Sequence, residues 1–234
     1  PMNFFLKFFQ NHGLFKLSNR PQWYTVTQRS RTYVNKVLSQ ISGEHYKNYQ
    51  INSIKRISSG VQVYYGGDNE FFDYDKAVIA THADEALSLI KNPTELEKSI
   101  LSKFGYKENH AVLHFDENIM PKNKKAWSSW NSFVDPKDLN KSSLSYWLNL
   151  LQNLKIKKNV FLTLNPFKNI PEDKILKKIK FTHPYYNQSA LENQKNLKNI
   201  QNRENLLFCG SYFGYGFHED GIKSSIEMLK NLNE

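Results

Sequence analysis

Glycines near the end of the sequence are spaced in a way that could hold a ligand. An apolar run, Leu206–Cys209, meets Gly210, and Gly214, Gly216 and Gly221 follow it. Glycine tolerates positive φ angles and lets a ligand approach the backbone closely. A helix is predicted to begin just before Gly221, and a helix N-terminus offers free N–H groups to an anion. The spacing indicates a cradle for a phosphate or carbonyl group, although an ordinary glycine-rich turn would have the same spacing.

Three histidines are candidates for chemistry. His110 and His114 stand four residues apart on a predicted strand, so their side chains face the same side. A metal ion would need a third ligand, which the nearby sequence does not supply, and we expect no metal site. Both histidines could instead have a structural role. For His110, a place near a substrate is a further alternative. His218 precedes the predicted helix. It is expected either to approach a ligand or to cap or pack against the start of this helix.

Aromatic residues offer a second kind of site. Trp130, Tyr212 and Tyr215 are candidates for the wall of an apolar substrate tunnel. Tyr212 and Tyr215 are the better candidates, because they lie among the glycines that follow Cys209. The alternative is ordinary core packing, since each ring buries a large apolar area. Cys209 is interpreted as a small buried side chain and not as a nucleophile.

The composition restricts the class of protein. The chain has 234 residues, a formal charge of +10 and one cysteine, so no internal disulfide framework is expected. No nucleic-acid module accompanies the charge, and we expect no nucleic-acid partner. No apolar run reaches the roughly 18 residues of a membrane span. A cytoplasmic location is predicted, with a peripheral contact at the inner membrane as an additional expectation. The sequence begins with Pro1 and Met2, and we expect a natural N-terminal portion to be missing.

Apolar periodicity and turn residues predict an alternation of helices and strands. The predicted helices cover 3–12, 31–41, 83–90, 93–104, 171–179, 190–201 and 219–232. The predicted strands cover 51–57, 61–65, 71–73, 76–81, 110–115, 127–130, 144–148, 160–164, 180–183 and 206–209. Turns are predicted at 20–23, 58–60 and 66–69. The strand 76–81 is continuously apolar, as strands buried on both faces of a parallel sheet are.

Two segments together resemble the flavin amine-oxidase superfamily. Its members have a hairpin followed by a strand of the type Asp-x-Val-Ile-x-Ala/Thr, which resembles Asp75–Thr81. Their C-terminal pattern is an apolar strand, a glycine, a loop and an acidic-Gly helix start, which resembles Phe208–Gly210 and Glu219–Ser225.

The sequence is more similar still to bacterial predicted NAD/FAD-binding amine-oxidase-like proteins. The shared stretches follow one another along nearly the whole chain. They are 11–14, 20–23, 80–84, 112–114, 120–121, 126–131, 164–166, 183–184 and 214–221.

The resemblance implies an α/β (α+β) fold. A partial Rossmann-like FAD/NAD(P)-binding domain, residues 26–82 and 196–234, is interleaved with a mixed-sheet substrate domain, residues 1–25 and 83–195. It also implies that Ile51 touches the adenine of FAD through its backbone. The residues that line the pyrophosphate, ribityl chain and flavin carbonyl are then Gly210, Ser211, Glu219, Asp220, Gly221 and Ile222.

The sequence departs from the family pattern at three places. The N-terminal Gly-x-Gly-x-x-Gly that holds the FAD pyrophosphate is absent from the chain. Gln28 and Arg29 stand where a paired glycine is usual. His110 stands where amine oxidases often place a lysine near flavin N5. The last difference argues against amine oxidation specifically and leaves hydride transfer to a flavin intact.

The predicted protein is an FAD-dependent oxidoreductase that removes a hydride from a small apolar substrate, lipid-like substrates included. His110 and His218 are its candidate catalytic residues. The missing N-terminal half of the same protein is its expected partner. The alternatives are a non-catalytic basic protein that binds a lipid or membrane surface, and an inactive truncated fragment.

Overall fold

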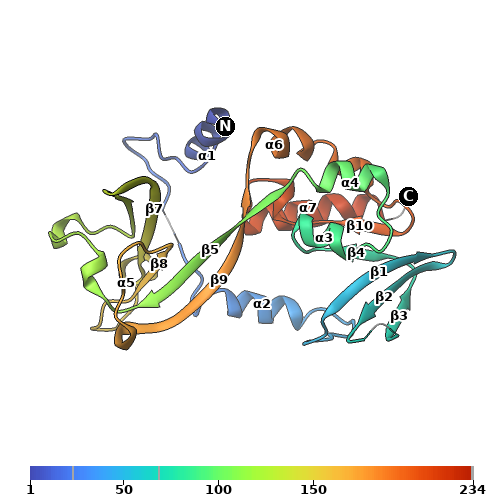
Figure 1. Cartoon of the computed structure of the whole chain (residues 1–234), viewed down its shortest axis with the longest axis horizontal. Helices are drawn as coiled ribbons and strands as arrows, with labels where there is room; N and C mark the ends of the chain where they lie inside the picture. The colour runs from blue at the N-terminus through green and yellow to red at the C-terminus, as the bar shows by residue number, and fades with distance from the viewer. Residues whose placement is uncertain (23, 68, 233–234) are drawn as a thin grey trace. The chain divides into compact units, whose positions relative to one another are not determined.

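Two compact units make up the chain in the computed structural model, which describes residues 1–22, 24–67 and 69–232. Unit 1 comprises residues 1–106 and 184–234, and unit 2 comprises residues 107–183. The chain passes between them within strands β5 (Gly105–His114) and β9 (Ile175–Tyr185), as can be followed in Figure 1. The fold is mixed α/β, as predicted.

Unit 1 contains two small sheets. The first is an antiparallel meander, and the second is a parallel pair of strands. The meander strands are β1 (Ile51–Ile57), β2 (Gly60–Tyr65) and β3 (Phe71–Tyr74). The parallel strands are β4 (Ala77–Ile79) and β10 (Leu206–Phe208). These strands confirm the prediction, except that Val78 is 44% exposed and β4 is therefore not buried on both faces. Asp68, in the predicted turn 66–69, lies outside the described residues.

Six α-helices are described in unit 1. They are α1 (Met2–Asn11), α2 (Ser30–Leu38), α3 (Ala83–Leu89), α4 (Glu95–Leu101), α6 (Gln188–Gln194) and α7 (His218–Lys230). The single helix predicted over 190–201 is divided into α6 and a 3₁₀ turn, Leu197–Ile200. The turn predicted at 20–23 includes Trp23, which lies outside the described residues.

The helix boundaries follow the capping chemistry of the sequence. α4 begins at Glu95, two residues later than predicted, because the Thr94 hydroxyl accepts from the Glu97 N–H at 3.2 Å and the Glu97 carboxylate accepts from the Thr94 N–H at 2.8 Å. Glu97 is fully buried, and its charge is paired with Arg56. α3 begins at Ala83, as predicted, and is capped at His82, where the Glu85 carboxylate accepts from the His82 N–H at 3.2 Å.

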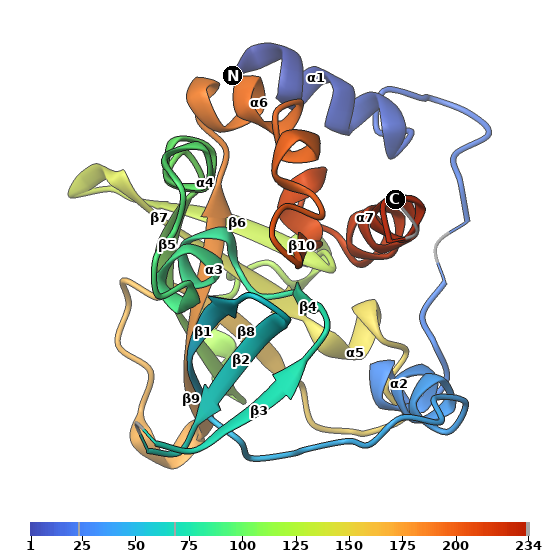
Figure 2. The same ribbon diagram turned by 90° about the vertical axis from the view of Figure 1, so that its right-hand side faces the viewer.

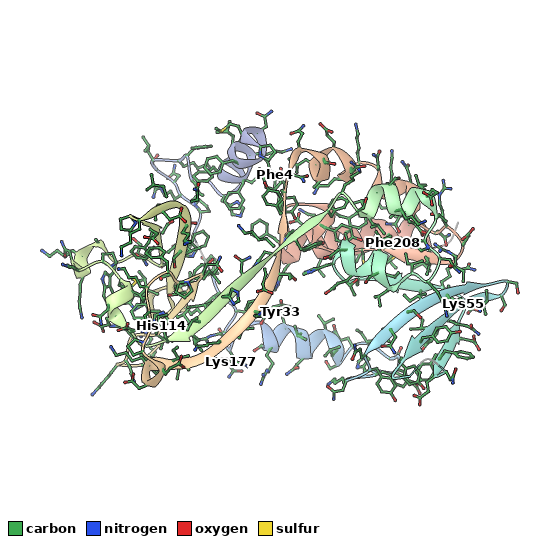
Figure 3. All side chains as sticks on the ribbon, in the orientation of Figure 1. Phe4, Tyr33, Lys55, His114, Lys177 and Phe208 are labelled. Carbon is green, nitrogen blue, oxygen red and sulfur yellow. The ribbon has the colours of Figure 1, made fainter. Side chains whose placement is uncertain are left out.

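The core of unit 1 lies between these helices and the sheets. Phe208, labelled in Figure 3, is fully buried in it together with Leu206. On α7, Met228 packs against Leu207 and Cys209. Cys209 is therefore a small buried side chain, as predicted. α7 and β10 are neighbours in both ribbon views (Figures 1 and 2).

Unit 2 is built on one five-stranded sheet of order β6-β7-β8-β5-β9. Its further strands are β6 (Trp130–Asp135), β7 (Asp138–Trp147) and β8 (Phe161–Leu164), and a short helix α5 (Leu148–Leu151) follows β7. The strand predicted at 127–130 is wrong, because β6 begins only at Trp130. The helix predicted at 171–179 is also wrong, because only a 3₁₀ turn, Glu172–Lys174, precedes β9.

The compact units do not follow the predicted domain boundaries. The boundaries predicted after residues 25, 82 and 195 all fall inside unit 1. The core that α3 and α4 share with β10 explains why residues 83–101 belong to this unit. Which parts hold a cofactor and which hold a substrate stays a prediction.

A buried polar network lies within the sheet of unit 2. His114 is fully buried, and its Nδ1 accepts from the Asp116 N–H at 3.0 Å. Its Nε2 lies 2.7 Å from the Thr163 hydroxyl, which lies 2.8 Å from the Ser145 hydroxyl. Burial lowers the pKa of His114 to about 4, against the opposing charge of Asp116. His114 is therefore a satisfied neutral histidine.

This network predicts a pH-dependent stability for unit 2. Because the pKa of His114 falls from 6.5 to about 4 on folding, its contribution is complete above pH 6.5 and is lost as the pH falls to about 4. The loss should reach about 3 kcal/mol. Denaturant unfolding at a series of pH values across this range gives the free energy of unfolding of the wild type and of His114→Gln. The loss is the difference between the two proteins in the slope of this free energy against pH. Ser142→Ala, at an exposed and non-titrating position of β7 in the same sheet, is the control and should retain the wild-type slope.

Candidate cofactor site

The parallel pair of strands places two loops at the same edge of unit 1. β4 ends at Ile79 and β10 ends at Phe208, which are partners in register. The Cys209 N–H donates to the Ile79 carbonyl at 3.2 Å and continues the pairing beyond the strands. In open α/β sheets, ligands bind outside the carboxyl ends of such strands. The loops that follow Ile79 and Phe208 therefore form the candidate site.

The loop after β4 is held by Tyr106. The Tyr106 hydroxyl accepts from the Ala83 N–H at 2.9 Å, and its ring stacks on His82 with centroids 4.2 Å apart. Burial raises the pKa of Tyr106 to about 12, so this hydroxyl stays neutral. The Ala83 N–H lies in the first turn of α3, and Tyr106 satisfies a group that would otherwise lack a partner in the helix.

Gly210 begins the loop after β10, which we call the glycine loop (residues 209–217). Gly210 has a φ of 152°, and a Cβ placed on it would lie 2.8 Å from Cε1 of Tyr212. Its N–H donates to the Ser224 hydroxyl at 2.9 Å, which ties the loop to α7. The loop passes so close to Tyr212 and α7 that this position requires glycine.

Two further glycines allow the loop to fold back on itself. The Gly214 and Gly216 N–H groups both donate to the Ser211 carbonyl at 3.1 Å. A Cβ on Gly214 would lie 2.2 Å from Asp220, and one on Gly216 would lie 2.9 Å from the Tyr186 hydroxyl. The predicted site residue Ser211 therefore organises the loop through its backbone.

A glutamine of α6 fixes the outer part of the loop. The Gln194 side chain donates to the Tyr212 carbonyl at 3.0 Å and to the Gly214 carbonyl at 2.6 Å. Sequence reasoning missed this residue, because nothing local marks a helical glutamine as the holder of a loop about twenty residues away.

The first turn of α7, unlike the closely packed glycine loop before it, has open space beside its backbone. The Asp220 carboxylate accepts from the Phe217 N–H at 3.0 Å, so Asp220 caps its own helix. Glu219 is exposed and lies 3.4 Å from Lys223. Among the described residues, and apart from the backbone of α7 itself, nothing lies within 4 Å of a Cβ placed on Gly221. The space beside Gly221 is therefore open, although the Gly221 N–H itself donates to the Phe217 carbonyl at 3.2 Å. The N–H groups of the residues just before Gly221 have no acceptor within the helix.

The electrostatics of this turn favour one class of ligand. The carboxylates of Glu219 and Asp220 already complement the positive end of the helix dipole. They would repel a second anion, whereas a neutral carbonyl oxygen could still accept from the backbone. The turn therefore suits a carbonyl of a cofactor ring better than a pyrophosphate.

The other predicted residues of unit 1 have diverse surroundings. His218 begins α7, and its Nδ1 lies 2.7 Å from the Tyr33 hydroxyl on α2. Ile222 is 60% exposed on α7, and Ile51 is 37% exposed at the start of β1. The cofactor contacts of Ile51 and Ile222 stay predictions, as does a catalytic role of His218.

The two loop tyrosines belong to the interior. Tyr212 is only 2% exposed, and its ring lies 5.4 Å from Phe104 and 4.8 Å from Phe213. Burial raises the pKa of Tyr212, and its hydroxyl has no hydrogen-bond partner in the described part of the chain. Tyr215 is half-buried, with its ring 4.9 Å from Phe4. Their contact with a substrate stays a prediction.

His110 and Trp130 lie in unit 2. His110 is exposed, and its Nε2 lies 3.0 Å from the Glu108 carboxylate. Trp130 is 51% exposed, with its ring 6.0 Å from that of Tyr146. The site thus brings together Gly210, Ser211, Glu219, Asp220 and Gly221, whereas His110 and Trp130 belong to the other unit. Residues 1–22, 24–67 and 69–232 contain no group of three or more His, Cys, Asp or Glu that could hold a metal.

Comparisons with known proteins identify the fold. No family model matches the sequence, and no curated protein is significantly similar to it. A CLA-producing fatty acid isomerase from P. acnes matches with a TM-score of 0.62 and 11% identity, over 89% of this chain and 53% of that chain. A putative protoporphyrinogen oxidase from Exiguobacterium sp. 255-15 matches with 0.62 and 11%, over 99% and 58%. Putrescine oxidase bound to putrescine matches with 0.58 and 7%, over 88% and 53%.

These similarities show the fold of the chain. The chain spans only about half the length of the solved structures that it matches. The fold of the chain is therefore one that also occurs in a fatty acid isomerase and in oxidases.

The contrast between Gly210 and Gly221 predicts opposite effects of one substitution. Gly210→Ala should destabilise unit 1 by about 1–3 kcal/mol, because the new methyl group meets Tyr212 at an unfavourable φ. Gly221→Ala should leave the stability unchanged or raise it by up to about 1 kcal/mol, because it adds a helix former in open space. Thermal unfolding followed by circular dichroism measures both. Equal losses would show that the Gly221 position is closed.

Proposed function

We propose that the chain is part of an FAD-dependent oxidoreductase that removes a hydride from an apolar, lipid-like substrate. The supporting observation is the open backbone at Gly221, on the carboxyl side of the β4 and β10 pair. A mixed fold shared with oxidases and a fatty acid isomerase agrees with this proposal.

The residues present fit a flavin ring. FAD would supply the redox chemistry by accepting a hydride at its N5 atom. The free N–H groups of the first turn of α7 would orient the ring by donating to a ring carbonyl. The packed glycine loop keeps that turn in place, through Gly210 and Ser224. The half-buried Tyr215 would keep water from one side of the ring.

One edge of the parallel pair is closed by a side chain. The Gln201 amide donates to the Phe208 carbonyl at 2.8 Å and its oxygen accepts from the Phe208 N–H at 3.0 Å. It therefore occupies the hydrogen-bonding groups that a further strand beside β10 would use.

The other edge, along β4, is open. The Ala77 N–H and the Ile79 carbonyl face β10, so the backbone groups of Val78 face away from it. In the described ranges β4 pairs with β10 alone. Parallel sheets are normally larger and covered on both faces. We infer that a further parallel strand, from the missing N-terminal half predicted above, pairs with β4 and brings the other wall of the FAD site.

The proposed strand predicts a change in amide exchange. The Val78 N–H should exchange rapidly with deuterium in this chain, because the amide has no strand partner beyond β4. It should be protected in the product of the complete gene. The Leu207 amide, which faces β4, is the internal control and should be protected in both. Rapid exchange of Val78 in the complete product would contradict the strand addition.

Flavin binding tests the function itself. The product of the complete gene should purify with, or take up, a ligand with flavin absorbance. Gly221→Leu should lower its affinity for FAD by at least about tenfold, because the side chain fills the open space over the first turn of α7. Gly67→Leu is a matched control, since a Cβ placed on Gly67 also has nothing within 4 Å, but Gly67 lies in the β2–β3 turn. A protein that takes up no FAD would refute the proposal.

The second candidate function is that of a non-catalytic protein which binds a membrane surface. Exposed apolar residues near Phe5 favour it. A flavin spectrum separates the two candidates, because only the oxidoreductase needs one.

A further inference from the structure

Helix α1 has two apolar faces. On the inner face, Phe4 stacks with Tyr186 at a centroid distance of 4.8 Å, and Phe8 stacks with Phe217 at 5.8 Å. Phe4, labelled in Figure 3, therefore holds α1 against Tyr186 and, through Tyr215, against the glycine loop. The inner face accounts for two of the phenylalanines in the helix, but it leaves the others without a role in the core.

The outer face of α1 is apolar and exposed. Met2, Phe5, Leu6 and Phe9 recur at helical spacing on the side opposite Phe4 and Phe8. Met2 is 69% exposed, Phe5 50% and Leu6 43%. A helix of a globular protein usually presents polar residues on its outer face, so this face has another function.

The residues after α1 extend the same surface. The Phe9 ring lies 4.2 Å from Phe5 and 5.5 Å from Phe15, measured between centroids. Phe15 is 56% exposed and Leu17 is 96% exposed. We call Met2, Phe5, Leu6, Phe9, Phe15 and Leu17 the apolar patch. The rings of Phe5 and Phe15 each contact that of Phe9, and Leu17 lies two residues further along the chain. Exposed apolar patches mark interaction sites.

Positive charge surrounds the apolar patch. Lys7 lies on α1 itself, and Lys16 stands between Phe15 and Leu17. The Arg20 side chain donates to the Lys16 carbonyl at 2.8 Å, which brings a third cation to this place. Residues 1–43 contain no Asp or Glu. The segment therefore has a single sign of charge beside a large apolar surface.

The charge selects among partners. A second copy of the chain would bring the same acid-free segment to the patch, and the like charges would repel. An anionic bilayer would accept the apolar side chains below its headgroups and the lysines at its phosphates. α1 has ten residues and is too short to cross a bilayer, so it would lie along the surface. In the part of the chain that the structure describes, no helix could serve as a membrane span.

We propose that the apolar patch docks the protein on the surface of an anionic lipid bilayer. Phe5, Phe15 and Leu17 enter the interface, while Lys7, Lys16 and Arg20 contact lipid phosphates. This contact is independent of the proposed flavin chemistry, although it would place the glycine loop, which Phe4 contacts through Tyr215, near a source of apolar substrates.

Vesicle sedimentation tests the docking with the whole chain. The wild type should bind vesicles of phosphatidylcholine mixed with phosphatidylglycerol, and added salt should weaken the binding. The double variant Phe5→Gln, Leu17→Gln should bind at least about tenfold more weakly, because both side chains leave the interface. Lys16→Glu should lose about fivefold or more on the anionic vesicles, because a favourable charge near the surface is reversed.

Matched controls come from unit 2. Leu139→Gln replaces a leucine that is 80% exposed, and Lys177→Glu reverses an exposed lysine of β9. Both should bind like the wild type, and circular dichroism should show all variants folded. Three results would overturn the proposal: no binding by the wild type, equal binding to pure phosphatidylcholine, or equal losses in the controls. Association of the wild type into dimers through the patch, abolished by Phe5→Gln and Leu17→Gln while vesicle binding persists, would overturn it as well.

Discussion

The parallel pairing of β4 with β10 is the contact on which the candidate site depends. It joins residues 77–79 to residues 206–208, which are far apart in the sequence. It aligns the ends of the two strands, so that the His82 region and the glycine loop begin side by side. It also sets the direction of α7, because Met228 packs on Leu207 from the same short strand. Without the pairing, the glycines would belong to an unrelated surface loop.

Much of unit 1 could be predicted from the sequence, because its signals are local. The meander strands alternate in polarity between glycine turns, and α4 begins at a complete capping box. The glycines of the loop could be recognised as a group. Their partners could not, because Tyr186, Gln194 and Ser224 meet the loop only through tertiary packing. The openness at Gly221 was equally hidden, since the sequence does not distinguish a glycine that packs from one that leaves space.

The strands at the two ends of the unit 2 sheet were the hardest to predict. β9 carries Lys177, Lys178 and Lys180 and ends near Pro184. Charged residues and proline are typical of edge strands, which bury little and need to avoid pairing with other chains. Such strands lack the apolar alternation on which a prediction rests, and the first part of β9 was predicted to be helical. β6 is the other end strand of this sheet, and its alternation was likewise too weak to place it.

The Gln201 side chain leaves the small parallel sheet only one edge, that of β4, at which a further strand can pair. Because its amide holds both backbone groups of Phe208, no strand can join beyond β10 unless this glutamine is displaced. Two chains that met through their open β4 edges would form a closed pair related by twofold symmetry, and no free edge would remain at either end. Run-on fibres need two complementary edges on every molecule, and for this sheet the second edge becomes available only when the Gln201 side chain is displaced.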